Sequence, residues 1–303
     1  MPTLFIEPDQ QQLAITSDKT ILAGATEQGI PIAHACGGHA RCTTCRVYVL
    51  HGIDYLSART TEEEALAQRM KFPPCIRLAC QTRIHGDVSI RRATIEELDP
   101  QIYQVQRSQA AMVGRLGEEK NVSALFADIV GYTPFAERTP AYDVVHILNR
   151  YFYMMSQIVK FHWGHIIDYY GDGFFASFEQ QADSSVHMLN AVQAGQEMFR
   201  ALNAFNESLE ANYQHRFAIR IGIHSGEAIV GTIGTDDTIK PTVIGDPINL
   251  ASRIEQANKS TGTSFLICET TYGAVRNLVS IKGHYQVSLR GKQGQFTVYE
   301  VAL

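Results

Sequence analysis

Cysteines are the residues of this chain whose type and spacing point most directly to chemistry. Cys36, Cys42 and Cys45 lie within ten residues, and Cys80 follows after a longer interval. Four thiolates are what the two irons of a [2Fe–2S] cluster require as ligands. Zinc is the alternative, but zinc sites prefer paired C-x2–4-C knuckles, and only Cys42 and Cys45 form one. The spacing therefore predicts a cluster held by one loop and one more distant segment.

The remaining cysteines and several histidines carry no comparable pattern. We expect Cys75 to be a buried packing residue near the cluster and Cys268 to belong to a core strand. We interpret His34 and His39 as polar groups of the cysteine loop, since four cysteines leave no vacancy for a histidine ligand. We expect no functional partner for three further histidines, His162, His165 and His224.

Two aspartates form a second candidate site. Asp128 follows an apolar strand expected at 122–127, and Asp172 lies in the hairpin turn Gly171-Asp172-Gly173. The elements around them are expected to alternate as β-α-β-β-α-β, in which the third strand runs antiparallel beside the first. The end of the first strand then faces the hairpin. The two carboxylates would converge, as two Mg²⁺ or Mn²⁺ ions require for phosphoryl chemistry.

The backbone after Asp128 enters the next expected helix through Gly131, Tyr132 and Thr133. N–H groups at the start of a helix have no partner inside it. They can therefore receive the phosphates of a nucleoside triphosphate.

The elements that position these groups divide the chain into three parts. Residues 1–93 are expected to form short strands around one helix, with the strands near 4–7, 13–16, 46–50, 77–81 and 88–91 and the helices near 21–28 and 61–69. Residues 94–119 are polar and interrupted by Pro100, which suits a linker or transducer segment. Residues 120–303 are expected to be regular α+β, with strands near 122–127, 166–170, 174–178 and 217–224 and helices near 144–159 and 184–205.

The N-terminal part resembles [2Fe–2S] ferredoxins of the adrenodoxin-like and bacterial type. The resemblance rests on PIAHACGGHARCTTCRVYV and RLACQ and extends over nearly the whole segment. It implies a β-grasp domain, and its C-x5-C spacing is one residue longer than the plant pattern. A redox partner would be expected for such a domain.

The C-terminal part resembles the catalytic domain of class III adenylate and guanylate cyclases, a βαββαβ, ferredoxin-like palm. Five segments carry the resemblance in family order, namely FADIVGYT, YYGDGFFASF, IRIGIHSGEAIVG, VIGDPINLASRIE and LRGKQGQFTVYEV. The resemblance implies a homodimer with two active sites at its interface, each with two metal ions and a purine nucleoside triphosphate. A diguanylate cyclase would need a GG[DE]EF-type hairpin, and YYGDGFF is not one.

The same resemblance implies a role for each matching residue. Asp128, Asp172 and the backbone carbonyl of Ile129 match metal ligands. Arg220 matches an arginine that contacts the outer phosphates, and Arg290 stands where the family usually has a phosphate-binding lysine. Two residues four apart on one helix face match the ribose-orienting asparagine and the transition-state arginine, Asn249 and Arg253.

The base-reading positions depart from the family pattern. Adenylate cyclases usually place a lysine and an aspartate where this chain has Asp168 and Thr242. Threonine at the second place resembles an adenylate cyclase subgroup. An ionised carboxylate is an acceptor only, so Asp168 suits guanine N1–H and N2 amino groups better than adenine N1. The family more often uses ATP, so the prediction is ATP to cyclic AMP, with GTP to cyclic GMP as the alternative.

Composition sets the remaining expectations. The chain carries 26 basic and 31 acidic residues, a formal net charge of −5, so no nucleic-acid or membrane-surface partner is expected. The N-terminus does not resemble a secretory signal and no apolar stretch approaches membrane-span length, which favours the cytoplasm. The overall prediction is a cyclase regulated by the iron–sulfur domain, with a non-catalytic redox sensor as the other alternative.

Overall fold

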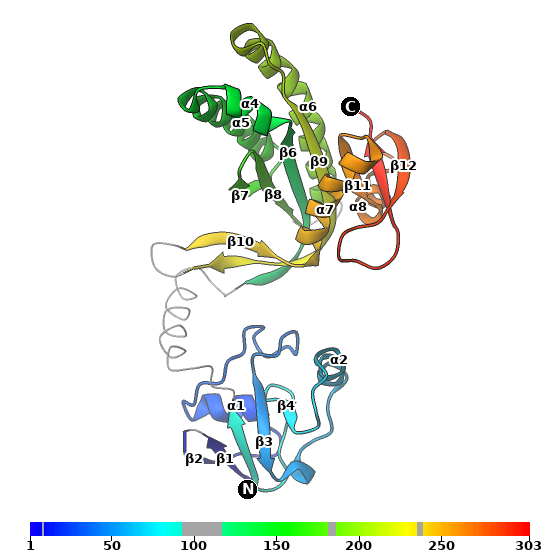
Figure 1. Ribbon diagram of the computed structural model, residues 1–303. Helices are drawn as coiled ribbons and strands as arrows, with labels where there is room; N and C mark the ends of the chain where they lie inside the picture. The colour runs from blue at the N-terminus through cyan, green and yellow to red at the C-terminus, as the bar shows by residue number, and fades with distance from the viewer. Residues whose placement is uncertain (8, 93–116, 181–185, 235–238) are drawn as a thin grey trace. The chain divides into compact units, whose positions relative to one another are not determined.

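The computed structural model describes residues 1–7, 9–92, 117–180, 186–234 and 239–303. The chain divides into two compact units, unit 1 (Met1–Gly114) and unit 2 (Arg115–Leu303) (Figure 1). Most of the linker expected at 94–119 lies outside the described residues. Its last residues, from Glu118 onward, already belong to the first strand of unit 2.

Unit 1 is a mixed five-stranded sheet in the order β2-β1-β5-β3-β4, in which β1 and β5 pair parallel and the other neighbours pair antiparallel. Its elements are β1 (Thr3–Glu7), β2 (Gln11–Ala14), α1 (Ile21–Glu27), β3 (Arg46–His51), a 3₁₀ turn (Ile53–Tyr55), α2 (Thr61–Met70), β4 (Ile76–Leu78) and β5 (Val88–Arg92). The apolar side chains of β1, Leu4 and Ile6, alternate into the core, as a half-buried strand requires. The β-grasp prediction is confirmed.

Capping side chains begin both helices of unit 1. Thr20 accepts a hydrogen bond from the Ala23 amide, and Thr60 accepts one from the Glu63 amide, each at 3.2 Å. Glu63 of α2 is also buried against Arg77 of β4, with two N–H···O contacts of 2.9 Å each. A third hydrogen bond, 2.7 Å from the Leu78 amide, completes the carboxylate's partners. This ion pair fixes the strand that leads into Cys80.

Unit 2 is built on one large sheet in the order β12-β13-β11-β9-β6-β8-β7, with β10 paired to β9. Its elements are β6 (Glu118–Val130), α4 (Tyr132–Arg138), α5 (Ala141–Phe161), β7 (His165–Tyr170), β8 (Gly173–Glu179), α6 (Val186–Tyr213), β9 (Ala218–Ile233), β10 (Lys240–Ile244), α7 (Asp246–Thr261), β11 (Phe265–Cys268), α8 (Glu269–Val275), β12 (Ile281–Val287) and β13 (Phe296–Val301). Neighbours from β9 through β7 pair antiparallel. The expected β-α-β-β-α-β order is therefore confirmed.

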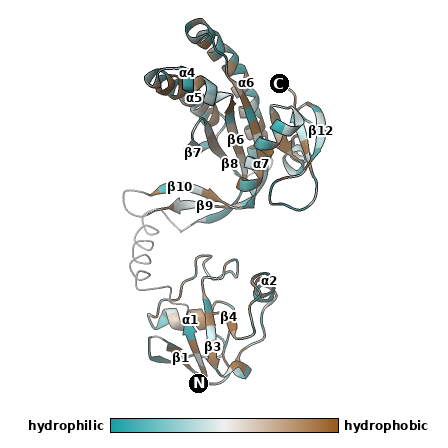
Figure 2. Ribbon diagram, in the orientation of Figure 1, coloured by the Kyte–Doolittle hydropathy of each residue, from teal (hydrophilic) through white to brown (hydrophobic). Residues whose placement is uncertain are grey.

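The two faces of this sheet carry different helices. Alternate residues of β6, such as Leu125 and Ala127, pack with the apolar sides of α5 and α6. The intervening residues, such as Val122 and Ala124, belong to the core beneath α7. Side chains alternate along a strand, so the even-numbered residues of β6 lie on the α7 face. Hydrophobic residues accordingly gather on the strands and on the helix sides that cover them (Figure 2).

Some element boundaries differ from the sequence prediction. β4 ends at Leu78 rather than at 81, because the chain turns there and the Gln81 and Thr82 amides both donate to the Leu78 carbonyl. β2 lies at Gln11–Ala14, slightly before the expected 13–16. β6 and β9 are longer than expected because they pair with each other over thirteen positions.

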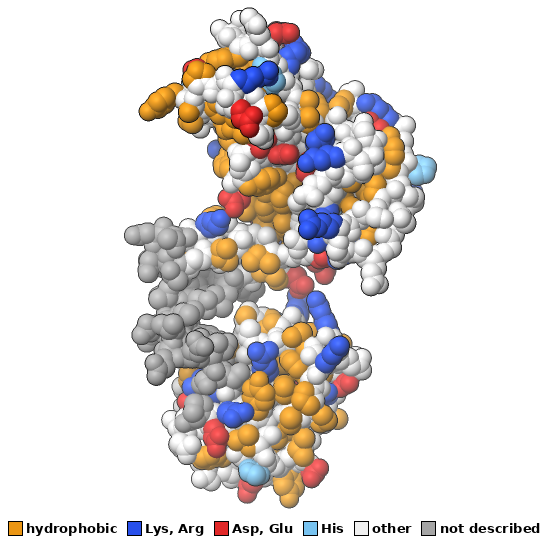
Figure 3. All heavy atoms as spheres, viewed as in Figure 1, with side chains coloured by type: hydrophobic (Ala, Val, Ile, Leu, Met, Phe, Trp, Pro, Cys, Tyr) orange, Lys and Arg blue, Asp and Glu red, His pale blue; other side chains and the backbone are white. Residues whose placement is uncertain are grey.

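The surface of unit 2 shows acidic and basic side chains interspersed on the face in view (Figure 3). None of the described helices combines the length and the apolar composition that crossing a bilayer requires.

Candidate functional sites

The four predicted cluster cysteines lie in two places that the fold brings together. The Cys45 thiol donates to the Cys80 sulfur across 3.4 Å, and the Ala79 amide donates to the Cys45 carbonyl at 3.0 Å. Cys36 and Cys42 lie in the preceding loop, where their side chains hydrogen-bond to each other. One loop and one distant segment therefore supply the thiols, as predicted.

The loop between Cys36 and Cys42 is shaped so that its amides face sulfur. Gly37 and Gly38 have φ values of 72° and 89°, which glycine adopts without strain. Burial raises the pKa of the Cys36 thiol, but amides including those of Arg41, Gly38 and His39 donate to the sulfur and bring its pKa below the ordinary value.

The hydrogen bond between Cys45 and Cys80 shifts the pKa values of the two thiols in opposite directions. The hydrogen bond from the Cys45 thiol lowers the pKa of Cys80 to about 6 and raises the pKa of Cys45 itself. The Gln81 side chain and the Ala40 amide also donate to the Cys80 sulfur. Donors directed at sulfur stabilise thiolates, which are the form that binds iron.

This arrangement fits a [2Fe–2S] cluster by its donor set. Each iron of such a cluster takes two cysteine thiolates, so the ligands need to converge as two pairs rather than on one ion. The Cys45–Cys80 contact and the Cys36–Cys42 contact supply two such pairs. Within the described part of the chain, no three His, Cys, Asp or Glu side chains are grouped around a single ion position.

Cys75 differs from its prediction. It is exposed rather than buried, because it lies in the turn just before β4 rather than in the core. His34 is a loop residue as expected, with its Nδ1 2.7 Å from the Ile32 carbonyl oxygen.

The two aspartates of unit 2 lie at the same edge of the sheet. Ala127 pairs with Phe174, so Asp128 at the end of β6 lies level with the hairpin that holds Asp172. Gly173 allows this close approach, since a Cβ there would lie 2.8 Å from the Ala127 carbonyl oxygen. On the other side of β6, Asp128 is directly opposite Arg220 of β9. The predicted convergence of strand end and hairpin is present.

The electrostatics of this pair suit a divalent cation. Burial raises the pKa of Asp128, although the charges of Lys259 and Arg220 oppose the shift. Burial and the charge of Asp128 together raise the pKa of Asp172. Two half-buried carboxylates that disfavour each other's ionisation would gain from divalent metal ions between them. The donor set therefore fits Mg²⁺ or Mn²⁺.

Glu255 of α7 is a third carboxylate of this region, which the sequence prediction did not include. It is 6% exposed, and one of its carboxylate oxygens is buried without a hydrogen-bond partner among the described residues. Burial, followed by the charge of Asp128, raises its pKa to about 7. Glu255 follows Arg253 by two residues on a largely polar helix, so the sequence pattern did not predict that its side chain is buried.

Helix α7 carries the predicted ribose and transition-state residues. Asn249 is exposed, with a weak hydrogen bond of 3.5 Å to the Gly245 carbonyl. Arg253 has one buried guanidinium nitrogen with no hydrogen-bond partner in the described part of the chain, and Gly291 lies beside the guanidinium group. No ion pair joins Arg253 to Asp128 or Asp172 within the described residues of this chain.

The loop before β13 carries Arg290, which is exposed. Its neighbour Lys292 forms an ion pair of 2.6 Å with Asp246 at the start of α7.

The turn after β6 carries the residues predicted to bind phosphate with their amides. Gly131 has φ 72° and precedes α4, which begins with Tyr132 and Thr133. Ile129 lies between Asp128 and this turn, with its side chain in the core.

The base-reading positions are joined by a lysine that the sequence prediction missed. Asp168 of β7 forms an ion pair with Lys240 of β10, with 3.0 Å between Oδ2 and Nζ. Thr242, two residues after Lys240, pairs with Gly231 of β9. A long-range ion pair between two exposed side chains has no local sequence signal.

Two of the histidines have partners, contrary to expectation. His162 lies 2.7 Å from Glu197, and His224 hydrogen-bonds to Cys268. Cys268 is the last residue of β11 and is buried, as expected. Its sulfur also lies 3.2 Å from the Thr271 hydroxyl. Burial raises the pKa of Cys268, but the His224 hydrogen bond and charge lower it to about 7.

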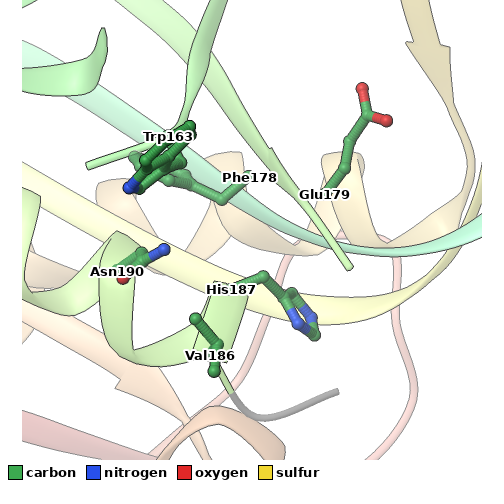
Figure 4. A pocket seen from close by; sticks show the side chains of 6 residues that line it. All are labelled: Trp163, Phe178, Glu179, Val186, His187 and Asn190. Atoms are coloured by element: carbon green, nitrogen blue, oxygen red, sulfur yellow. The ribbon is translucent and has the colours of Figure 1, made fainter. Parts of the chain in front are cut away.

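A cavity of about 140 Å³ lies elsewhere in unit 2 (Figure 4). Its lining residues are Trp163, Phe178, Glu179, Val186, His187 and Asn190. None of the predicted site residues lines this cavity, and the structure describes all of them. The cavity is therefore separate from the candidate nucleotide site.

Comparison with known families assigns the class of the chain. Residues 115–302 match the adenylate and guanylate cyclase catalytic domain, and residues 4–85 match the 2Fe-2S iron-sulfur cluster binding domain. The first match covers more than half of the chain. The chain therefore belongs to the adenylate and guanylate cyclase family and carries a 2Fe-2S domain ahead of the cyclase domain.

Individual relatives agree with this assignment. Adenylate cyclase 1 of Rhizobium meliloti (strain 1021) is 32% identical over 188 residues, which are 62% of this chain and 28% of the relative. The adenylate cyclase of Anabaena cylindrica is 33% identical over 193 residues, 60% of this chain and 37% of the relative. The chain thus spans about a third of the length of these curated relatives.

Solved structures of both nucleotide specificities resemble unit 2. The adenylyl cyclase CyaB from P. aeruginosa has 27% identity and a TM-score of 0.57, covering 61% of this chain and 95% of that one. The guanylyl cyclase Cya2 has 31% identity and a TM-score of 0.57, covering 61% and 93%.

Proposed function

We propose that unit 2 is a purine nucleotide cyclase that converts ATP to 3′,5′-cyclic AMP and pyrophosphate. The observation that carries the proposal is the convergence of Asp128 and Asp172 at one sheet edge, beside Arg220. Two mutually repelling carboxylates next to an arginine form a site for divalent cations and a polyphosphate. The adenylate cyclases among the relatives support ATP as the substrate.

The proposed roles of the metal and phosphate residues follow from their places. Asp128, Asp172 and the Ile129 carbonyl would hold two Mg²⁺ or Mn²⁺ ions. These ions, when bound, lower the pKa of the ribose 3′-hydroxyl and neutralise phosphate charge. Arg220, together with the amides of residues 131–133, would bind the outer phosphates.

The residues of α7 would act on the ribose and on the reacting phosphorus. Asn249 orients the ribose, so that its 3′-oxygen faces the α-phosphorus. Attack forms the new P–O bond of the ring while the bond to pyrophosphate breaks. Arg253 stabilises the charge that develops on the α-phosphoryl oxygens, and Arg290 binds the phosphates as the usual lysine would.

Two chains would share each site. Asn249 is exposed, and one Arg253 guanidinium nitrogen has no hydrogen-bond partner among the residues that the structure describes. Both residues would therefore be available to a nucleotide held by the aspartates of a second chain. A homodimer would contain two equivalent sites, because each chain carries both sets.

Guanylate cyclase is the second candidate function. The Asp168 carboxylate at a base-reading position favours it, since guanine offers N1–H and N2 amino donors. The similarity to the guanylyl cyclase Cya2 is compatible with that reading.

Unit 1 would regulate this activity through the state of its cluster. Cys36, Cys42, Cys45 and Cys80 would hold the cluster, whose potential is set by the donors around the sulfurs. Equal cyclase activity of the oxidised, reduced and cluster-free protein would contradict regulation.

Product analysis tests the proposed function. Purified, cluster-loaded protein is incubated anaerobically with Mn²⁺ and either ATP or GTP, and cyclic nucleotide and pyrophosphate are quantified by chromatography. We expect cyclic AMP from ATP, lost in Asp172→Asn and retained in the control Asp54→Asn, which removes an exposed charge in unit 1. Cyclic GMP as the main product would select the second candidate. Absence of both products from dimeric protein would favour a non-catalytic redox sensor.

A further inference from the structure

The Asp168–Lys240 ion pair lies where the base of the nucleotide is expected. Its two atoms are 3.0 Å apart, and both side chains are about half exposed. An exposed ion pair of this kind contributes little to stability, typically below about 1 kcal/mol. Its contribution to folding is therefore small, and its position at the base-reading residues suggests a role in nucleotide recognition.

Each oxygen of the Asp168 carboxylate accepts one hydrogen bond and keeps a second lone-pair site. Oδ1 accepts a hydrogen bond of 3.1 Å from the Tyr169 amide, and Oδ2 accepts the bond from Lys240. A β-bulge between Ile166 and Asp168 sets the register of Asp168 opposite Phe175. Bulges re-aim the side chains that follow them. The fold therefore directs Asp168 toward β10.

Lys240 retains hydrogen-bonding capacity after this contact. An ammonium group has three donors and no acceptor, and Asp168 uses one of them. Lys240 and Thr242 lie two residues apart in β10, so their side chains leave the same face of the strand. Lys240 thus places a cation beside the position that the sequence prediction assigned to base recognition.

We propose that Lys240 is a specificity-determining residue that reads adenine together with Asp168. The lysine ammonium donates to adenine N1, and the Asp168 carboxylate accepts from the N6 amino group. The proposal rests on the proposed cyclase function and names the missing donor at its base-reading site. It removes the repulsion between an acceptor-only carboxylate and adenine N1.

The ion pair matches the Watson–Crick edge of adenine. Adenine presents one donor and one acceptor along this edge, which a neighbouring carboxylate and ammonium satisfy. Guanine presents the acceptor O6 beside two donors, N1–H and the N2 amino group, and a carboxylate accepts from both donors best with both of its oxygens. Tyr169 and Lys240 each donate to one of those oxygens here, and so take two of the four lone-pair sites. Removing Lys240 would free the carboxylate for guanine.

The experiment compares the full chain with Lys240→Met, which keeps an unbranched side chain but removes the charge. The matched control is Lys19→Met, since Lys19 is another exposed lysine in an ion pair, with Glu27 at 2.7 Å in unit 1. kcat/KM is measured with Mn²⁺ for ATP and for GTP. A charge-assisted hydrogen bond supports an expected fall of about tenfold or more in the ATP-to-GTP ratio of kcat/KM. Lys19→Met should leave the ratio unchanged.

A binding measurement separates failure of this proposal from failure of the cyclase proposal. 3′-Deoxy-ATP and 3′-deoxy-GTP lack the attacking hydroxyl, so their Kd values can be measured by calorimetry without turnover. Lys240→Met should weaken 3′-deoxy-ATP relative to 3′-deoxy-GTP by a similar factor. An unchanged Kd ratio would overturn base reading by Lys240, whatever the wild-type activity. A ratio that moves toward ATP would also overturn it, since Lys240 would then be donating to guanine O6.

Discussion

Gly222 of β9 lies directly against the backbone of Glu255 in α7. A Cβ at residue 222 would be 2.1 Å from the Glu255 nitrogen and 2.6 Å from its Cα. Asn258, one turn later, donates from Nδ2 to the Ile221 carbonyl at 3.0 Å. This close contact and the hydrogen bond together hold α7, the helix of Asn249 and Arg253, on the sheet face that carries Asp128.

Gly222→Ala should therefore displace α7. The clash is with backbone, which cannot rotate away, so overpacking should cost about 2–3 kcal/mol of unfolding free energy in urea. Cyclase activity should also fall, because Asn249 and Arg253 would move with α7. Gly273→Ala is the control, since a Cβ there meets no atom within 4 Å. Equal stability of the two variants would show that α7 does not rely on this approach.

Glu255 should make the metal-free protein less stable as pH rises. Its pKa in the folded chain is about 7, above the ordinary 4.5, so the folded state holds the proton more tightly than the unfolded state. The stability from this proton is present below about pH 4.5 and is lost as pH rises through about 7. Glu255→Gln should remove this slope, gaining about 2–3 kcal/mol at pH 8 in EDTA.

The measurement is urea unfolding from pH 5 to pH 8, followed by a probe in unit 2. Glu207→Gln, which removes an exposed carboxylate of α6, should keep the wild-type slope. If wild type and Glu255→Gln lost stability in parallel across this range, the burial of Glu255 would not be the source of the pH dependence.

The cluster ligands can be separated from the spare cysteine by substitution. Cys45→Ser and Cys80→Ser should lose the visible absorbance of the cluster, because these two sulfurs form one of the two ligand pairs. Cys75→Ser should keep it, since Cys75 is exposed and lies in the turn before β4 rather than in the cysteine loop. Iron and sulfide analysis should give about two irons per chain in wild type and Cys75→Ser. Zinc in place of iron, or a need for Cys75, would contradict the assignment.

The buried Glu63–Arg77 pair should support cluster retention from a distance. Glu63→Ala leaves the Arg77 guanidinium buried without its carboxylate and the Leu78 amide without its acceptor. Such a loss typically costs about 3–5 kcal/mol. The variant should bleach at lower temperature than wild type, whereas exposed Glu62→Ala should not. Identical bleaching of all three proteins would show that β4 holds Cys80 without this pair.

The sequence predicted the parts of both sites that depend on local pattern. Cysteine spacing placed four thiols on two segments, and the β-α-β-β-α-β order placed Asp128 opposite the hairpin of Asp172. Both follow from periodicity and turn chemistry, which are properties of short stretches. The boundaries of β6 and β9 were less well predicted, because their length depends on pairing with each other.

Long-range contacts were not predictable from the same patterns. Lys240 meets Asp168 across 72 residues, and no feature of either segment indicates the pair. Glu255 is buried where Gly222 lets α7 approach the sheet closely. Cys75 was expected inside because cysteine is usually buried, but it lies in an exposed turn before β4. Tertiary packing decided each of these positions.

Mixing two inactive variants is the measurement that tests the shared-site cyclase most directly. Asp128→Asn removes a metal ligand and Arg253→Ala removes the transition-state cation, so each variant alone should form almost no cyclic nucleotide from ATP and Mn²⁺. After subunit exchange at equal concentrations, half of the dimers would be mixed and each would hold one intact site, restoring about a quarter of wild-type activity. Activity that stays at the level of the separate variants, with exchange verified by tagged chains, would contradict an active site built from two chains.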